Sequence, residues 1–296
     1  MSEQNVLAEQ FQASRARLRA VAYRMLGSAN EADDAVQEAW LRLARADSSE
    51  VDNLGGWLTT VVARVCLDML RARKTRREEP LATDAVERLA SPGDAESEMQ
   101  FADGIGLALL VVLDTLAPNE RVAFVLHDLF NLQFDVIAPI INRSLAATRQ
   151  LASRARRRVQ GSPEPDGDRD RQRELVSAFR AASREGNFSA LLAVLDPEVV
   201  LRADAAAVMA SVARREHGAP SLTPETRGAA AVAKIFEGRA QAARQALVDG
   251  GAGMVFAPGG EVQVVFEFVI EQGRILEISL IADPANISSL QLSIDV

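Results

Sequence analysis

Residues Leu116–Gln160 read LAPNERVAFVLHDLFNLQFDVIAPIINRSLAATRQLASRARRRVQ, a stretch that predicts three consecutive helices. An apolar helix from about residue 119 is followed by the short helix FDVIAPII, then by a turn at Asn142 and Arg143. Ser144 then opens a long helix. This order of elements is typical of a helix-turn-helix, in which the last helix enters the major groove of DNA.

The break before the long helix has its own local chemistry. Asn142 is one of the few non-glycine residues that tolerate a left-handed backbone, and Ser144 is a good N-cap. Pro139, by contrast, lies beyond the first turn of the short helix, where a proline removes a backbone hydrogen bond. We therefore expect a well-defined start for the long helix and a kink or a late start in the short one.

The long helix has one apolar face and one polar face. The apolar stripe follows helical spacing and contains Thr148, Leu151, Ala152, Ala155 and Val159. The rest of its surface carries Arg149, Gln150, Ser153, Arg154, Arg157 and Arg158. Arginine and glutamine on the first turns can reach base edges, while later arginines suit phosphates. The alternative is a basic helix that only faces water.

Charge is distributed unevenly along this acidic chain of 296 residues with a net charge of −8. Residues 1–160 carry 20 Lys and Arg against 22 Asp and Glu, whereas residues 161–296 carry 13 against 19. The basic residues of the first part gather in RARKTRR, which begins at Arg71, and in the long helix. Because the local field decides where a polyanion binds, the acidic total does not exclude nucleic acid.

Several classes of protein are disfavoured by what the sequence contains. Cys66 is the single cysteine, so we expect neither a disulfide framework nor a cysteine-based zinc site, and no metal or cofactor. The start, MSEQNVLAEQF, does not have the pattern of a secretory signal, and no apolar run reaches the length of a membrane span. A cytoplasmic protein without a membrane segment is the expectation.

Two helices are predicted before the loop that begins near residue 46. The first, from Leu7 to Leu26, ends at Gly27, and Ser28 or Asn30 can cap the second. The polar residues of the second helix that should face outward are Asp33, Asp34, Gln37, Glu38 and Arg42. From the residues alone a solvated polar face is favoured over a docking surface.

A third helix, from about Leu54 to Arg77, is expected to have two unlike halves. Its first half is an apolar stripe and its second half is basic, with Arg71, Arg73, Lys74, Arg76 and Arg77. A basic half that projects from a core can lie on a phosphate backbone. Residues 80–102 contain Pro92 and Gly93 and predict a flexible linker to the next helix.

The second half of the chain begins after the breaker-rich joint SPEPDGD at residues 162–168. Helical patterns come first, then a strand over 198–204, a helix over 228–244 and three strands over 248–257, 261–271 and 274–282. Gln272 and Gly273 predict a tight hairpin. Helices followed by an antiparallel sheet indicate an α+β domain.

Three strings in residues 11–160 carry a resemblance to a known family. They are AYRMLGSANEADDAVQEAWLRL, WLTTVVARVCLDMLRARKTRREE and the helix-turn-helix stretch quoted above. In order and spacing they resemble bacterial sigma factors of the extracytoplasmic-function group of the sigma-70 family. The resemblance implies an RNA polymerase subunit that recognises promoters and initiates transcription, with region 2 in residues 1–79 and region 4 in residues 103–160.

The resemblance also implies three sets of site residues. Docking on the β′ clamp helices of core RNA polymerase would use Asp33, Asp34, Gln37, Glu38 and Arg42, and the polymerase β flap would be a further partner. Recognition and melting of the −10 element would use Asn53, Arg64, Arg71, Arg73, Lys74, Arg76 and Arg77. Reading of the −35 element would use Arg143, Ser144, Arg149, Gln150, Ser153, Arg154 and Arg157.

Residues 169–296 resemble the SnoaL-like, ketosteroid-isomerase-like fold, joined to the sigma regions by a linker over 161–168. Some extracytoplasmic-function sigma factors carry such a domain as a fused regulator that contacts the sigma core. Those relatives share two short sequence motifs in this domain. At the corresponding positions this chain has Asp204–Val208 and Asp283–Ile287, whose residues differ in part from the motifs. The expected architecture is therefore two all-α sigma domains followed by a cone-shaped α+β domain.

Two other functions stay open at this point. A ligand-responsive regulator could use the helix-turn-helix without polymerase. An isomerase or hydrolase in the second half would need a carboxylate base and an oxyanion donor, yet the only tyrosine is Tyr23 and His217 stands alone. An apolar pocket for a small ligand, without catalysis, is the more favoured role for that half.

Overall fold

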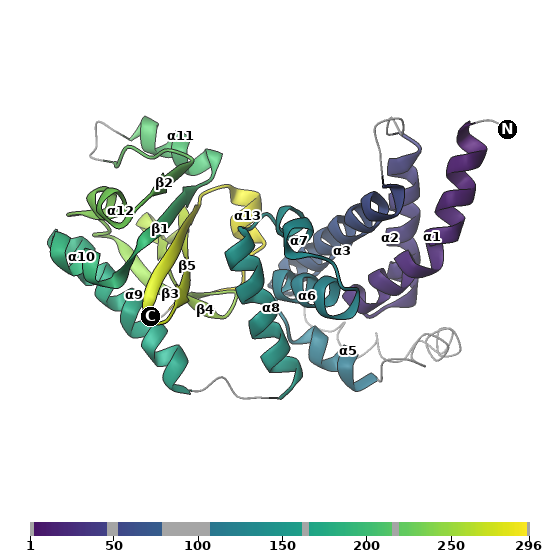
Figure 1. Ribbon diagram of the computed structural model, residues 1–296, viewed down its shortest axis with the longest axis horizontal. Helices are drawn as coiled ribbons and strands as arrows, with labels where there is room; N and C mark the ends of the chain where they lie inside the picture. The colour runs from purple at the N-terminus through teal and green to yellow at the C-terminus, as the bar shows by residue number, and fades with distance from the viewer. Residues whose placement is uncertain (1–2, 46–52, 79–106, 162–165, 215–218, 295–296) are drawn as a thin grey trace. The chain divides into compact units, whose positions relative to one another are not determined.

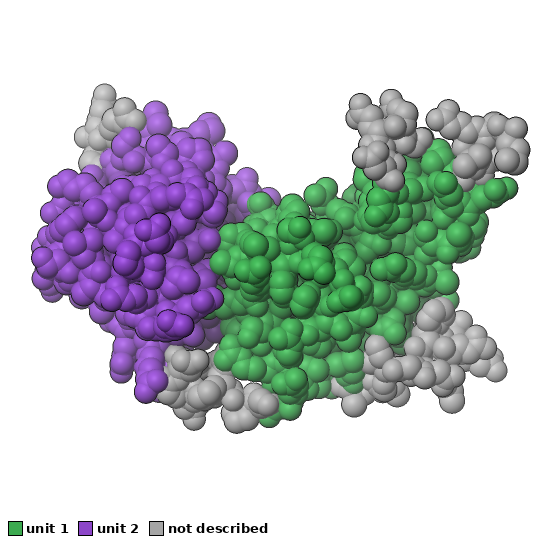
Figure 2. All heavy atoms as spheres, viewed as in Figure 1, with its two compact units in different colours: residues 1–161 green, residues 162–296 purple. Residues whose placement is uncertain are grey.

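The computed structural model describes residues 3–45, 53–78, 107–161, 166–214 and 219–294. It divides the chain into two compact units, residues 1–161 and 162–296 (Figure 2). Each unit has its own hydrophobic core, because no core cluster contains residues of both. The predicted linker over 80–102 lies outside the described residues, and residues 166–168 of the second predicted linker are already helical.

Unit 1 begins with three helices, α1 (Glu3–Leu26), α2 (Ala29–Leu43) and α3 (Leu54–Glu78). Gly27 ends α1 with a φ of 73°, a backbone conformation that glycine adopts without strain. The hydroxyl of Ser28 then accepts a hydrogen bond from the backbone N–H of Glu31 and caps α2. The expected start of α2 is confirmed, with Ser28 rather than Asn30 as its cap.

The other helices described in unit 1 form the predicted helix-turn-helix. They are α5 (Leu107–Asp114), α6 (Pro118–Phe124), the π-helical turn η3 (Val125–Leu129), α7 (Phe134–Ile141) and α8 (Leu145–Val159). Asn142 has a φ of 54° and ends α7, and the Ser144 hydroxyl accepts from the Ala147 backbone N–H at 3.1 Å. Both local predictions for the turn are confirmed. Pro139 lies inside α7, on its exposed side, and α7 begins at Phe134 without a delayed start.

Every helix described in residues 3–45, 53–78 and 107–161 contributes to one hydrophobic core, which runs from Phe11 in α1 to Ala155 in α8. Helix α3 packs against α6 and α7 as well as against α1 and α2. Arg121 of α6 adds a polar connection, because it pairs with Asp114 and donates to the carbonyl oxygen of Arg24 at 3.5 Å. The sequence predicted two helical domains with separate surfaces, whereas the described residues of this unit form a single packed body.

A buried carboxylate connects the first helix of the helix-turn-helix to the last. Glu120 is fully buried, and its Oε2 accepts from the backbone N–H of Ala117 at 3.3 Å. Its Oε1 lies 3.3 Å from Nε of Arg154, and Oε2 lies 2.8 Å from Nη1 of Arg158. Because a buried carboxylate needs charged partners, the position of α8 is tied to the start of α6.

Unit 2 combines helices with one seven-stranded sheet. Its helices are α9 (Asp166–Glu185), α10 (Phe188–Val194), α11 (Ala205–Ala213), α12 (Ala229–Phe236) and α13 (Pro284–Ser288). Its strands are β1 (Leu195–Ala203), β2 (Glu225–Arg227), β3 (Ala243–Val248), β4 (Gly251–Phe256), β5 (Val264–Glu271), β6 (Arg274–Ile281) and β7 (Leu292–Ile294). The strand order is β2-β1-β6-β5-β4-β3-β7, and only the β1–β6 pair is parallel.

The two faces of the sheet have separate cores. Phe179 of α9, Leu191 of α10 and Phe236 of α12 pack on one face, where Phe268 of β5 lies among them. The opposite face packs a smaller cluster that includes Leu290, near the C-terminus. Figure 1 shows the helices gathered beside the curved sheet of this unit. The predicted fold class, helical sigma regions followed by an α+β domain, is confirmed.

The sequence misplaced one pair of strands. The strand expected over 248–257 is β4, which begins only at Gly251. The helix expected over 228–244 ends at Phe236, and the strand β3 over Ala243–Val248, which was not predicted, pairs with β4 in a hairpin. Asp249 and Gly250, with φ values of 47° and 78°, form the turn. The Asp-Gly pair is a strong hairpin signal that the sequence interpretation overlooked, whereas the Gln272–Gly273 hairpin is confirmed.

Glu120→Ala should destabilise unit 1 by about 3–5 kcal/mol, because Arg154 would stay buried without its charged partner. Denaturant unfolding of the full chain measures the loss. The matched control is Asp128→Ala, which breaks the pair between Asp128 of η3 and the 42% exposed Arg156 of α8 and should cost about 1 kcal/mol or less. Equal losses for the two variants would contradict the structural role of Glu120.

Candidate nucleic-acid and protein interfaces

Helix α8 presents a polar stripe to solvent on the side opposite its core. Arg149 is exposed, and Gln150, Ser153 and Arg157 are partly exposed. These residues follow one another at helical spacing, so they share one face. At the start of the helix, Leu145 is 38% exposed, a residue that the sequence interpretation did not select. An exposed apolar side chain on a helix that enters the major groove can contact the methyl group of thymine.

Two further predicted contacts lie at the turn before α8. Arg143 is partly exposed, and its Nη1 donates to the Asn142 carbonyl oxygen at 2.8 Å. Ser144 is also partly exposed, but its hydroxyl already caps the helix. The turn therefore places a cation beside the N-terminus of α8, where backbone N–H groups also favour a phosphate.

Arg154 does not belong to the exposed stripe, contrary to the sequence prediction. It is only 7% exposed, on the same face as Leu151 and Ala155, and its guanidinium faces Glu120. Its aliphatic stem can pack in the core while its charge meets a buried acid. The spacing of three residues from Leu151 is a sequence signal for burial, but it could not identify the acid 34 residues away.

The basic half of α3 is also more enclosed than predicted. Arg73 is 18% exposed in its side chain, pairs with Glu31 of α2 and donates to the carbonyl oxygen of Leu26 at 2.8 Å. Arg71, at 23%, donates to Oδ1 of Asn119 in α6 at 3.5 Å. Both arginines therefore connect α3 to neighbouring helices and are only partly exposed, and their contact with the −10 element stays a prediction.

The other residues predicted for the −10 element differ in position. Arg64 is exposed on α3 and Lys74 is partly exposed, whereas the side chains of Arg76 and Arg77 lie outside the described residues. Asn53 is exposed, and its Oδ1 accepts from the backbone N–H of Gly56 at 2.9 Å, which caps α3. Residues 46–52, in the loop predicted to begin near residue 46, lie outside the described residues.

Helix α2 has a continuous outward stripe. Asp34, Gln37 and Arg42 are exposed, and Glu38 pairs with Arg42 at 2.9 Å. Leu41, which the sequence interpretation did not assign, is 41% exposed in the middle of the stripe. Asp33 lies apart, because both of its carboxylate oxygens pair with Arg19 of α1. An apolar residue among acids and amides suits a protein partner better than a phosphate backbone.

In unit 2, Asp204 connects the two segments that fall on motifs of the resembling sigma factors. Its Oδ1 accepts from the Ala207 backbone N–H at 2.7 Å and caps α11. Its Oδ2 accepts from the backbone N–H groups of Ala282 and Asp283, at 2.8 and 2.9 Å. The aspartate thus fixes α11 to the corner between β6 and α13.

The described residues contain little that suggests metal or thiol chemistry. No cluster of three or more His, Cys, Asp or Glu among them could hold a metal ion. Burial raises the pKa of the Cys66 thiol to about 12, so it stays protonated near neutral pH and is a weak nucleophile. His217 lies outside the described residues. None of the helices described here has the length and apolar character needed to cross a membrane.

Comparisons with known proteins agree with these features. Residues 10–76 match sigma-70 region 2, and residues 106–159 match sigma-70 region 4. The chain is 39% identical over 209 residues to a probable ECF RNA polymerase sigma factor SigI of Mycobacterium tuberculosis, covering 69% of this chain and 72% of the relative. It is 40% identical over 200 residues to the ECF RNA polymerase sigma factor SigJ of the same species, covering 66% and 64%.

A crystal structure of Mycobacterium tuberculosis SigJ is also similar, at 30% identity over 95% of this chain and 98% of that chain, with a TM-score of 0.39. The family matches fall on the helices that form the α2 stripe, the basic α3 and the helix-turn-helix. The alignment with SigI spans 209 residues and is therefore longer than sigma-70 region 2 or region 4 alone. The chain therefore belongs to the extracytoplasmic-function sigma factors of the sigma-70 family, which bind core RNA polymerase and direct it to promoters to initiate transcription.

Proposed function

We propose that α8 reads the −35 element of the promoter. Arg149 and Gln150 lie on the first turns and reach base edges, while Leu145 contacts a thymine methyl group. Arg143, Ser144, Ser153 and Arg157 flank them and contact the phosphate backbone. The single observation that carries this assignment is the exposed stripe of α8 beside a turn whose αL residue and N-cap fix the start of the helix.

The −10 element is assigned to the surface around the start and outer face of α3. Arg64 is exposed and Lys74 is partly exposed, and we assign both to this surface together with Arg76 and Arg77. Asn53 opens the helix beside the loop over 46–52. Taking a base out of the DNA stack costs roughly a few kcal/mol. Contacts that this surface makes only to single-stranded bases offset that cost.

The α2 stripe is proposed to dock on the β′ clamp helices of core polymerase. Its alternation of acids, an amide and Leu41 supports a protein contact, and its polar residues are exposed at helical spacing. Asp33 orients α1 and α2 through Arg19 instead of contacting the partner. We place a second contact, with the β flap, on residues 103–160. The chain acts in the cytoplasm under this proposal, where core polymerase works.

Unit 2 is proposed to modulate the sigma regions by contact and not by catalysis. Residues 161–296 hold 13 basic and 19 acidic residues, so this unit can shield the basic surface of α8 and of α3. The packed core of each unit supports treating them as separable parts. Shielding of this kind weakens as salt rises, because exposed charges interact over only about 10 Å at 0.1 M salt.

Arg149→Ala or Gln150→Ala should cost about 1–3 kcal/mol of binding on the cognate −35 sequence and relax specificity at the contacted base pair. Arg157→Ala should weaken binding to all sequences alike and lower the salt slope by about one. Binding titrations on cognate and scrambled duplexes at several salt concentrations measure both effects. Equal losses on every duplex for all three variants would refute the base-reading role of the first pair.

Leu41→Asp should weaken binding of core RNA polymerase about tenfold or more, because the contact would bury an unpaired carboxylate. Folding should be preserved, since Leu41 is already 41% exposed. The matched control is Met209→Asp, on the 72% exposed Met209 of α11 in unit 2, which lies outside both proposed polymerase contacts and should leave the affinity for core polymerase within about twofold. Competition binding against the wild-type chain measures both, and equal effects would contradict the α2 interface.

Residues 1–161, expressed without unit 2, should support promoter-dependent initiation by core polymerase and should bind promoter DNA more tightly than the full chain at low salt. The difference should shrink as salt rises, because the shielding is electrostatic. Run-off transcription from a selected promoter pool and DNA titrations compare the two chains. Equal DNA affinity at low salt would refute shielding. Silence from both chains, with DNA binding intact, would instead favour a regulator that does not use polymerase.

A further inference from the structure

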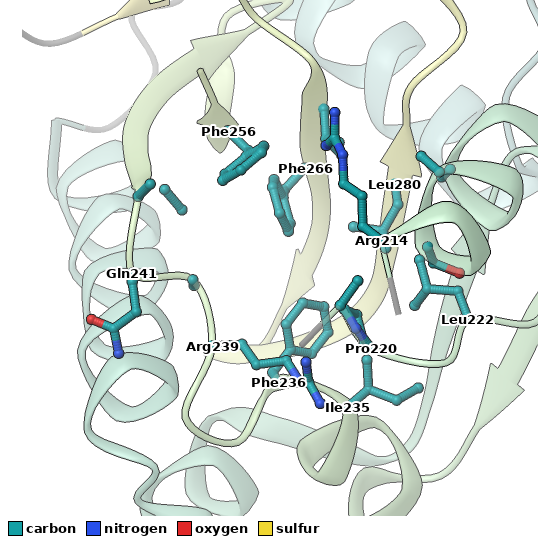
Figure 3. Close-up of a pocket in the computed structure, with 18 of the residues that line it drawn as sticks. Arg214, Pro220, Leu222, Ile235, Phe236, Arg239, Gln241, Phe256, Phe266 and Leu280 are labelled. Atoms are coloured by element: carbon teal, nitrogen blue, oxygen red, sulfur yellow. The ribbon is translucent and has the colours of Figure 1, made fainter. Parts of the chain in front are cut away.

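Unit 2 contains a cavity of about 850 Å³ between α11, α12 and the sheet. Strands β4, β5 and β6 form its back, and the segment after α12 forms one side. Figure 3 shows the side chains of several residues converging on it from these elements. The volume lies in the range, roughly 300–1,000 Å³, of cavities that hold small organic molecules.

The walls of the cavity are mainly apolar. Phe256 and Phe266 project from the neighbouring strands β4 and β5, and Phe236 comes from the end of α12 (Figure 3). The rings of Phe236 and Phe266 have centroids 6.3 Å apart with a tilt of 52°. Leu222 and Leu280 add branched aliphatic surface. Such walls favour a ligand with an aromatic or branched apolar body.

The charged residues of the cavity wall are mainly cationic. Arg214, directly after α11, extends a guanidinium whose Nη2 donates to Oε1 of Gln263 at 2.8 Å. This hydrogen bond holds the arginine in place, and a guanidinium has five N–H groups in all. Arg239 is a second cation among the lining residues, whereas the one carboxylate, Glu237, is already paired with Lys234 at 2.7 Å.

The lining residues also argue against catalysis in the cavity. No histidine, cysteine, tyrosine or aspartate is among the described residues that line it. The paired Glu237 would be the only carboxylate available as a base. A pocket that binds a ligand without reacting stays a prediction, and this cavity is where we place it.

We propose that this cavity binds an amphipathic anion, a small molecule with an aromatic or branched apolar body and one carboxylate or sulfonate group. The apolar body lies among Phe236, Phe256 and Phe266, and the anionic group meets Arg214. The site goes beyond the sigma function, because it would let a metabolite act on the unit fused to the sigma regions. It can be tested by binding alone, so its failure would leave the proposed promoter contacts unaffected.

The test uses the full chain and two fluorescent probes with the same aromatic frame. These are 1-anilinonaphthalene-8-sulfonate, which carries the anion, and N-phenyl-1-naphthylamine, which lacks it. Both should bind with enhanced, blue-shifted emission. Arg214→Gln should raise the dissociation constant of the sulfonate about tenfold and that of the uncharged probe less than about twofold, because only the sulfonate forms a charge-assisted hydrogen bond.

A second pair of variants tests the location. Ala210→Trp places a large side chain in the cavity wall and should abolish binding of both probes. Ala213→Trp adds the same bulk at an exposed position of the same helix, outside the cavity lining, and should leave both affinities unchanged. Thermal melting checks that each variant is folded.

Three outcomes would overturn the inference. The first is a wild-type chain that binds neither probe, and the second is equal binding by the Ala210→Trp and Ala213→Trp variants. The third is an Arg214→Gln variant that affects both probes alike, which would refute the preference for an anion. Because Arg214 is exposed, its substitution does not threaten folding, so this last comparison stands even if Ala210→Trp unfolds.

Discussion

The buried carboxylate of Glu120 is the interaction on which the DNA-reading part of the molecule depends. It sits at the start of α6 and pairs with Arg154 and Arg158 on α8. Hydrophobic contacts hold helices together without fixing their rotation closely, whereas a buried charge must meet its partners at hydrogen-bond distance. The angle at which α8 presents Arg149 and Gln150 to solvent is therefore set by a charge that is fully buried.

The arginines of unit 1 divide into two groups with different roles. Arg71, Arg73, Arg121 and Arg154 connect helices to one another, through Asn119, Glu31, Asp114 and Glu120 respectively. Arg64, Arg149 and Arg157 keep more of their charge toward solvent. A guanidinium serves both purposes because its stem packs against apolar surface while its planar head forms several directed hydrogen bonds. Counting basic residues therefore overestimates the surface that is available to nucleic acid.

Unit 2 follows a different constraint, because its sheet must be covered on both faces. Helices α9, α10 and α12 cover one face, and the C-terminal segment covers part of the other. Phe236 shows how a cavity coexists with this packing, since its ring contacts Phe179 in the core and Phe266 at the cavity. Asp204 then fixes α11, one wall of the cavity, to the end of β6. One wall of the cavity is thus held to the sheet by hydrogen bonds as well as by packing.

The sequence by itself determined the features that depend on neighbouring residues. The αL turn at Asn142, the cap at Ser144, the end of α1 at Gly27 and the hairpin at Gln272–Gly273 all follow from local backbone chemistry. The motif strings also sufficed to indicate the family. Only the tertiary structure decided which arginines are buried, that Leu41 is exposed among acids, and that a cavity lies beside Arg214. These depend on partners tens of residues away, such as Glu120 for Arg154, and periodicity along one helix carries no information about the helix packed against it.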